Sequence, residues 1–250
     1  MKLRFFAARC AVTVAALALL WIANGGAAYA GLIVLNTTGQ GADSSLGNDA
    51  TVLGTSNGGA GTAMEIRAGE ASTSRNRLGI VRWDITAAGG DLSGAILRVY
   101  ETGNNSRTVT VYGLNDGDAG ETWGEATITY DTAPAISLVT GPPPSTAFDS
   151  LRTTVLGTFN TTGSTTESLT FSSAALDAFL AADTNGLVSL YFYRDGGGAV
   201  TIRTKEFNYT GTIGAPPTLE LPNAVEVPEP ASLALVFVAM AAGAYFRRPR

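Results

Sequence analysis

Short runs in which apolar and polar residues alternate are the feature that most constrains how this chain folds. A period of two puts every second side chain on the same face of a strand, so each run predicts a half-buried β-strand. Gly, Asn, Asp, Thr and Ser separate the runs, as expected for turns between antiparallel strands. The runs cover residues 63–67, 78–85, 95–101, 108–114, 126–130, 153–159, 167–171, 187–194, 199–205 and 218–221. The pattern predicts an all-β fold, an antiparallel two-sheet β-sandwich or jelly roll.

One segment, residues 172–182, has a helical rather than an alternating period. Ser172 or Ser173 can cap its first turn, and apolar residues follow at helical spacing. These are Leu176, Phe179 and Leu180. The turn-forming residues 183–186 then end the pattern. We therefore predict one short helix in the sandwich.

The two ends of the chain differ in composition from the middle. Lys2, Arg4 and Arg9 precede an apolar stretch at 11–23, and Ala28 and Ala30 are the small residues that signal peptidase favours. At the other end a second apolar stretch, 231–246, precedes three arginines. We expect a signal peptide at 1–30 with its own helix, one domain at 31–226, and a C-terminal hydrophobic helix within 227–250.

The C-terminal stretch resembles the PEP-CTERM sorting signal of Gram-negative exopolysaccharide producers. Val227, Pro228, Glu229 and Pro230 form its motif, and the prolines hold the chain extended. The apolar helix would be about 24 Å long, shorter than a hydrocarbon core of about 30 Å, so a temporary anchor is favoured over an ordinary tail anchor. The resemblance implies processing by signal peptidase and an exosortase-type enzyme. It also implies localisation at the cell surface or in the extracellular matrix, as in a biofilm, after release from the membrane.

Composition excludes several classes of function. The chain has no histidine, and its single cysteine, Cys10, lies in the predicted signal peptide. The usual zinc ligands and the Ser-His-Asp triad are therefore missing. Six of the 16 basic and one of the 21 acidic side chains lie in the two ends, so residues 31–226 carry 10 basic and 20 acidic groups, a net charge of −10. Such a charge argues against nucleic acid as a partner.

Five segments, in order, resemble the DNRLRE domains, which are similar to carbohydrate-binding module family 96. Residues 74–85 resemble the segment that names these domains, with Trp83 in place of the usual Phe. The other matching segments are 92–100, 109–114, 121–134 (with Tyr130 in place of a Trp), and 204–206 with 216–219. Some members of that module family bind alginate. The resemblance therefore implies an exported, non-enzymatic protein that binds extracellular polysaccharide, an anionic uronate polymer being one candidate.

Alternation in the strands indicates which side chains are available to a glycan. Val81, Trp83 and Ile85, Leu97 and Val99, and Val188, Leu190 and Phe192 are expected in the core. Arg98, Tyr100, Tyr191 and Tyr193 fall on the opposite faces and are predicted to point outward. Sugar rings stack on aromatic rings, and arginine suits uronate carboxylates. These four residues are the candidate glycan contacts, although ordinary surface pairing explains them equally well. Trp123 is interpreted as a structural plug.

Acidic residues provide the other candidate chemistry. Asp116, Asp118, Glu121, Glu125 and Asp131 are close in sequence, and two carboxylates suffice for a glycosidase. We favour the interpretation that these acidic residues form turns and do not form a catalytic pair. Calcium is a candidate ligand, with Asp43, Asp49, Asp116 and Asp118 as candidate ligating residues, although their spacing is not that of an EF-hand. No other cofactor is expected. The competing hypotheses are a structural or adhesive matrix protein and a carboxylate-dependent hydrolase or lyase.

Overall fold

The computed structural model describes ten parts of the chain. They are residues 33–36, 42–49, 52–57, 62–67, 76–103, 105–139, 145–164, 168–196, 198–207 and 216–226. The predicted signal peptide, the sorting tail and their two helices lie outside these residues. Within them, no helix has the length and apolar character needed to cross a membrane.

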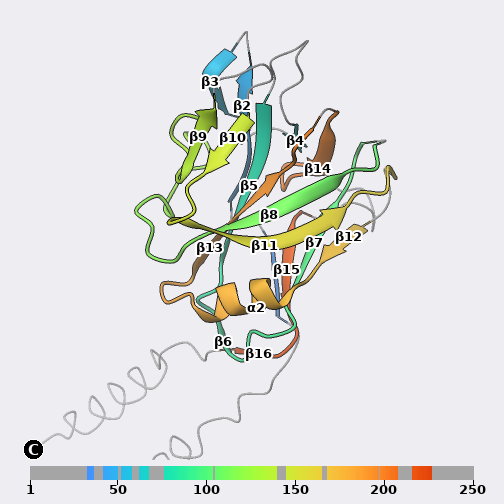
Figure 1. Ribbon diagram of the computed structural model, residues 1–250. Coiled ribbons are helices and arrows are strands. Elements are labelled where there is room, and N and C mark those ends of the chain that lie inside the picture. Colours follow the sequence, from blue (N-terminus) through green and yellow to red (C-terminus); the bar gives the residue numbers. More distant parts are fainter. Residues whose placement is uncertain are drawn as a thin grey trace, which may run out of the picture.

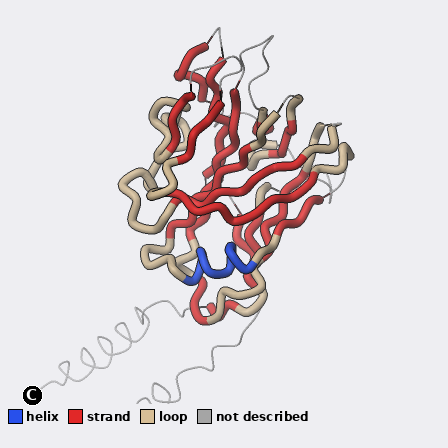
Figure 2. Tube along the Cα trace, in the orientation of Figure 1, coloured by secondary structure: helices blue, strands red, loops and turns tan. Residues whose placement is uncertain are grey.

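Strands dominate the described residues, and one short helix accompanies them (Figures 1 and 2). The elements are β1 (Ile33–Asn36), β2 (Ala42–Asp49), β3 (Val52–Asn57), β4 (Ala63–Ile66), β5 (Asn76–Asp84), β6 (Ala88–Gly90), β7 (Ile96–Tyr100), β8 (Thr108–Leu114), β9 (Ile136–Val139), β10 (Ser145–Phe148), β11 (Thr153–Asn160), β12 (Ser168–Phe171), α2 (Ala174–Ala181), β13 (Leu187–Tyr193), β14 (Val200–Arg203), β15 (Thr218–Leu221) and β16 (Ala224–Glu226).

Two larger sheets make up the sandwich. One has six strands in the order β11-β8-β13-β5-β2-β3, and the other has four in the order β1-β15-β7-β12. The strand pairs in both sheets are antiparallel. The predicted all-β, antiparallel sandwich is therefore confirmed.

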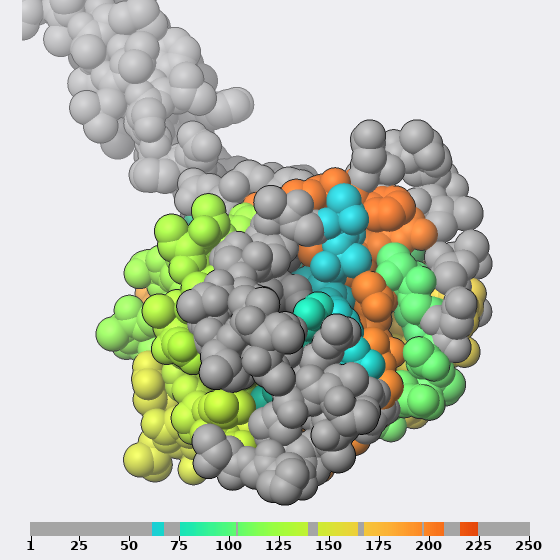
Figure 3. Space-filling view, turned by 90° about the horizontal axis from the view of Figure 1, so that it is seen from above, coloured from blue at the N-terminus to red at the C-terminus, as the bar shows by residue number. Residues whose placement is uncertain are grey.

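Three two-stranded sheets complete the fold: β9 with β10, β4 with β14, and β6 with β16. Figure 3 is seen from the end at which β4 lies, and shows residues 62–67 (cyan) beside β14 (orange). The yellow-green segment that contains β9 and β10 occupies the opposite flank of this view.

The main core lies between the two larger sheets. It combines apolar side chains of β5, β8 and β13 in one sheet with those of β7, β12 and β15 in the other. The residues that alternation assigned to the core are buried, as predicted. These are Val81, Trp83, Ile85, Leu97, Val99, Val188, Leu190 and Phe192.

A second core covers the outer face of the six-stranded sheet. Leu78, Ile80 and Tyr191 project from that face and pack against buried residues of the segment between β8 and β11. The residues of that segment in this core are Trp123, Ile128, Tyr130, Ala133 and Ala135, with Ile136, Leu138 and Phe148 packed against them. The central strands β5, β8 and β13 of this sheet are therefore covered on both faces, which their alternating pattern does not reveal.

The strand predicted at 126–130 is wrong. The backbone N–H groups of Thr127 and Ile128 both donate to the carbonyl of Gly124, at 3.0 and 2.8 Å, which makes a turn rather than a ladder. Thr132 then donates its backbone N–H to the carbonyl of Thr129 at 3.2 Å. The apolar side chains at 128 and 130 are buried because this turn lies over the sheet.

Trp123 holds the covering segment against the sheet, in agreement with its interpretation as a plug. Its side chain is 7 % exposed, and its Nε1 donates to the buried Oγ of Ser189 at 3.0 Å. The guanidinium of Arg82 lies 4.9 Å from the Trp123 ring centroid, and its Nη1 donates to the main-chain carbonyls of Glu121 and Trp123. One tryptophan and one arginine thus fasten the second core.

The outward orientation predicted for Tyr191 and Tyr193 is wrong. Tyr191 is fully buried, and its hydroxyl donates to the carbonyl of Pro134 at 2.6 Å. Tyr193 is 8 % exposed and packs edge-on against Tyr112 and Phe148. Alternation correctly separates both tyrosines from the main core, but their face of the sheet carries the second core instead of solvent.

The short helix predicted at 172–182 is confirmed as α2. Ser173 has an extended backbone and its Oγ accepts a hydrogen bond from the N–H of Leu176 at 3.0 Å, as an N-cap residue does. Leu176 and Leu180 are buried in the main core, and Phe179 packs against its edge. The helix lies at the lower end of the sandwich in Figure 1, beside β11.

Candidate functional site

The outer face of the four-stranded sheet carries the part of the predicted glycan site that remains at the surface. Because Leu97 and Val99 point into the core, Arg98 and Tyr100 of β7 point away from it. In the ladder, Tyr100 lies opposite Ser168 of β12, and Arg98 lies opposite Thr170 of the same strand. We call this set of five residues, Arg98, Tyr100, Ser168, Thr170 and Glu220, the β7–β12 face.

Arg98 is held in place on this face by an ion pair with β15. Its Nε donates to Oε1 of Glu220 at 2.6 Å and its Nη2 to Oε2 at 3.2 Å, while Nη1 lies 3.4 Å from the Oγ of Ser168. Hydrogen bonding to Glu220 raises the pKa of Arg98. The Tyr100 hydroxyl makes no hydrogen bond with the described residues. A fixed guanidinium and a half-exposed ring therefore lie two residues apart on one strand.

A groove of about 470 Å³ adjoins this face, between the edge strands β11 and β12. Its floor includes Phe159, Leu169 and Phe171. Exposed hydroxyl and amide groups line its walls, from Thr158, Asn160, Thr162, Thr170 and Ser172. Among the described residues, none with a charged side chain lines the groove. Ser168 and Thr170 belong to both the groove and the β7–β12 face.

Glu101, the residue after β7, supports the loop at one end of the groove. It is fully buried, and its Oε2 accepts hydrogen bonds from the backbone N–H groups of Thr162 and Gly163, at 3.0 and 3.1 Å. Its Oε1 is buried and accepts no hydrogen bond from the residues that the structure describes. Burial raises the pKa of the Glu101 carboxyl, although the two N–H groups oppose this effect.

The stability of the protein should therefore depend on pH through Glu101. A carboxyl whose pKa is higher in the folded than in the unfolded state favours folding when it is protonated, and that contribution disappears as pH rises through the folded pKa. We expect the free energy of unfolding to fall, relative to that of Glu101→Gln, as pH rises above about 4.5. Urea titrations at several pH values measure the difference. A difference that does not change with pH would contradict the expectation.

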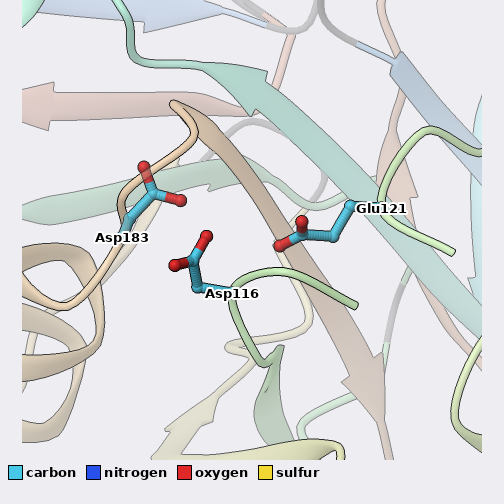
Figure 4. A group of neighbouring side chains, drawn as sticks. All are labelled: Asp116, Glu121 and Asp183. Atoms are coloured by element: carbon cyan, nitrogen blue, oxygen red, sulfur yellow. The ribbon is translucent and has the colours of Figure 1, made fainter. Parts of the chain in front are cut away.

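A second cluster lies in the loop after β8 and the turn before β13. Asp116, Glu121 and Asp183 each direct a carboxylate oxygen to the same place, and these atoms lie within 4.8 Å of one another (Figure 4). We call this cluster the acidic pocket. Asp116 is exposed, Asp183 is half-buried and Glu121 is 3 % exposed. Burial raises the pKa of both Glu121 and Asp183, and the neighbouring carboxylates add to the effect.

The other acidic residues predicted for this region are engaged elsewhere. Both oxygens of Asp118 accept hydrogen bonds from Arg152, at 2.7 and 2.8 Å, and this pairing lowers the pKa of Asp118. Glu125 is ion-paired with Lys205. Asp131 is exposed. Of the five carboxylates that were candidates for one cleft, the structure brings together only Asp116 and Glu121.

The remaining metal candidates, Asp43 and Asp49, lie in β2. The structure describes the backbone of this strand, and their side chains lie outside the described residues, so their role as ligands stays a prediction. Sequence reasoning missed Asp183, which it interpreted as a turn residue at the end of the helix. The signal was present as an Asp-Thr-Asn-Gly turn, but only the topology brings this turn to the loop after β8. The groove was missed for the same reason.

Comparison with protein families agrees with both resemblances. Residues 41–143 match the model of carbohydrate-binding module family 96, and residues 226–250 match the PEP-CTERM protein-sorting motif. The first match runs from β2 to β9 and includes Arg98, Tyr100, Asp116 and Glu121, whereas β12 and Asp183 lie beyond it. No curated protein matches the chain.

The matches define the class of the protein. It carries a region similar to a carbohydrate-binding module, and it ends in the sorting motif of an exported protein. A module of this kind indicates binding rather than catalysis.

Proposed function

We propose that the protein is exported to the cell surface or matrix and binds extracellular polysaccharide there, without enzymatic activity, through the β7–β12 face. The observation that carries the proposal is the half-exposed pair of Arg98 and Tyr100 within the part of the chain that matches the module family. Hydroxyl groups of β12 lie beside this pair. Together they supply a ring for stacking, a cation, and donors and acceptors for sugar hydroxyls.

The guanidinium of Arg98 suits an anionic glycan as the ligand. The planar guanidinium of arginine matches a carboxylate with two parallel hydrogen bonds, and Glu220 occupies this geometry in the unbound protein. A uronate carboxylate would take over part of this interaction, since the side chains of Arg98 and Glu220 are 31 and 16 % exposed. Binding of this kind should weaken as ionic strength rises.

The test compares two single variants of this face, and the double variant that combines them, with a matched control in affinity gels containing a uronate polymer or a neutral glucan. We expect Tyr100→Ala to weaken binding by about twofold to tenfold, since a stacked ring contributes about 0.5–1.5 kcal/mol. Arg98→Gln should weaken binding to the uronate polymer more than to the glucan. The double variant should lose retention and keep its melting temperature to within a few degrees.

Arg152→Gln is the control. Arg152 is also an ion-paired arginine, with Asp118, but it lies outside the β7–β12 face. The Arg152→Gln variant should bind the polysaccharide as the wild type does. If the double variant is retained like the wild type, this face is not the binding site. If the wild type is retained by neither polymer, a structural or adhesive role replaces the proposal, and release of unsaturated or reducing ends would indicate an enzyme.

A further inference from the structure

The acidic pocket is held in shape by hydrogen bonds that use one oxygen of each carboxylate. Oδ2 of Asp116 accepts from the hydroxyl of Thr184 at 2.6 Å, and Oδ2 of Asp183 accepts from the N–H of Gly186 at 2.7 Å. Oε2 of Glu121 accepts from the N–H of Gly117 at 3.1 Å and from Nδ2 of Asn185 at 2.5 Å. The other oxygen of each carboxylate accepts no hydrogen bond from the described residues.

The second oxygen of Glu121 points to a missing ligand. Glu121 is 3 % exposed, and its Oε1 is inaccessible to solvent and accepts no hydrogen bond within the described part of the chain. Its carboxylate is directed at Asp116 and Asp183 (Figure 4). A buried carboxylate oxygen without a partner is costly, and two further carboxylates beside it increase the cost. The pocket therefore has the ligand set of a cation site and one buried carboxylate oxygen that a cation would satisfy.

Basic side chains of the surrounding structure do not supply that partner. Arg152 is paired with Asp118, and Lys205 with Glu125. Arg82 donates to the main-chain carbonyls of Glu121 and Trp123, not to the Glu121 carboxylate. Three carboxylates thus converge without a compensating cation among the basic residues just named.

We propose that Asp116, Glu121 and Asp183 bind a calcium ion. Hard carboxylate oxygens are the ligands that calcium prefers, and they bind it at about 2.3–2.6 Å. Two oxygens on one such ion are therefore at most about 5 Å apart, and one carboxylate oxygen from each of the three residues lies within 4.8 Å of the other two. The hydrogen bonds from Thr184, Gly186 and Asn185 orient the ligands, as outer partners do in metal sites.

The ion would join two parts of the chain that are distant in sequence. Asp116 and Glu121 belong to the loop that leads into the second core, and Asp183 belongs to the turn between α2 and β13. Calcium should therefore stabilise the attachment of the covering segment to the sheet. The effect on stability is separate from glycan binding, because Arg98 and Tyr100 lie on the other sheet.

The test measures calcium binding by the purified protein after EDTA treatment and dialysis. Calorimetric titration with CaCl₂ should show saturable binding, and MgCl₂ should compete only weakly. Bound Tb³⁺ should luminesce by energy transfer from the nearby Trp123, and this luminescence should be lost when calcium displaces the Tb³⁺. At a calcium concentration a hundred times its Kd, the melting temperature should rise by roughly 5 to 10 °C. Glu121→Gln and Asp183→Asn should each weaken calcium binding at least about tenfold.

Asp118→Asn is the matched control, because this aspartate lies in the same loop but is bound by Arg152. It should bind calcium within about twofold of the wild type, although its stability falls. If Glu121→Gln does not fold, the exposed Asp116→Asn replaces it, with the same expected loss of affinity. No saturable heat with calcium, an equal affinity for magnesium, or unchanged calcium affinity in Asp116→Asn and Asp183→Asn would overturn the proposal.

Discussion

Tyr191→Ala is expected to lower the free energy of unfolding by about 3–5 kcal/mol, the range found when large buried aromatic side chains are removed from cores. Tyr191 is fully buried in the second core, where it packs edge-on against Phe148. Its removal would leave a cavity and an unsatisfied carbonyl at Pro134. Chemical denaturation monitored by circular dichroism measures the loss.

Tyr191→Phe separates the hydrogen bond from the packing. It keeps the ring and removes the hydroxyl, so it should cost about 1–3 kcal/mol, the penalty of leaving the Pro134 carbonyl buried without a donor. A Tyr191→Ala protein that is as stable as the wild type but fails to bind glycan would contradict the burial of this residue and restore it to the glycan site.

Trp123→Ala is expected to have a comparable effect, about 3–5 kcal/mol, because it detaches the covering segment from the six-stranded sheet. The variant loses the ring that lies against the Arg82 guanidinium and the donor to Ser189. Ser189 is fully buried and would keep a hydroxyl without this partner. Denaturation curves give the magnitude, and near-ultraviolet circular dichroism reports the loss of fixed aromatic packing.

Trp123→Phe is the milder variant at this position. It retains a ring for Arg82 and loses the hydrogen bond to Ser189. Its free energy of unfolding should therefore lie between that of Trp123→Ala and that of the wild type. If both variants lose less than about 1 kcal/mol, Trp123 does not fasten the second core.

Much of the sandwich could be predicted from the sequence, because its strands bury one face in the main core. The predicted strands at 108–114 and 218–221 have the bounds of β8 and β15, and the helix at 172–182 contains α2. Residues 126–130 show the limit of this reasoning. Their apolar side chains alternate as in a strand, but local hydrogen bonds to Gly124 and Thr129 make turns, and the side chains are buried by the sheet beneath.

The candidate sites were predicted only in part. Alternation placed Arg98 and Tyr100 correctly on an outer face, since the outer face of the four-stranded sheet is not covered where they lie. The same rule misplaced Tyr191 and Tyr193. An alternation with a period of two residues separates the two faces of a strand, but it does not show whether a face is covered by solvent or by another part of the chain. Because they are close in sequence, Asp116 and Asp118 were both predicted as metal ligands. In the structure Asp118 is hydrogen-bonded to Arg152, and the third carboxylate of the acidic pocket comes from Asp183. Long-range contacts of this kind have no local signal.

The pairing of β8 with β11 makes the covering segment a long connection between two neighbouring strands. These strands are neighbours in the ladder, and the N–H of Asn115 donates to the carbonyl of Arg152 at their ends, so residues 115–152 are the long connection of a single hairpin. The sheet beneath draws its strands from far apart in the sequence, whereas the connection has nothing to dock on until β5, β8 and β13 are joined. The second core therefore depends on the long-range pairing of the strands beneath it, whereas the main core does not depend on the covering segment.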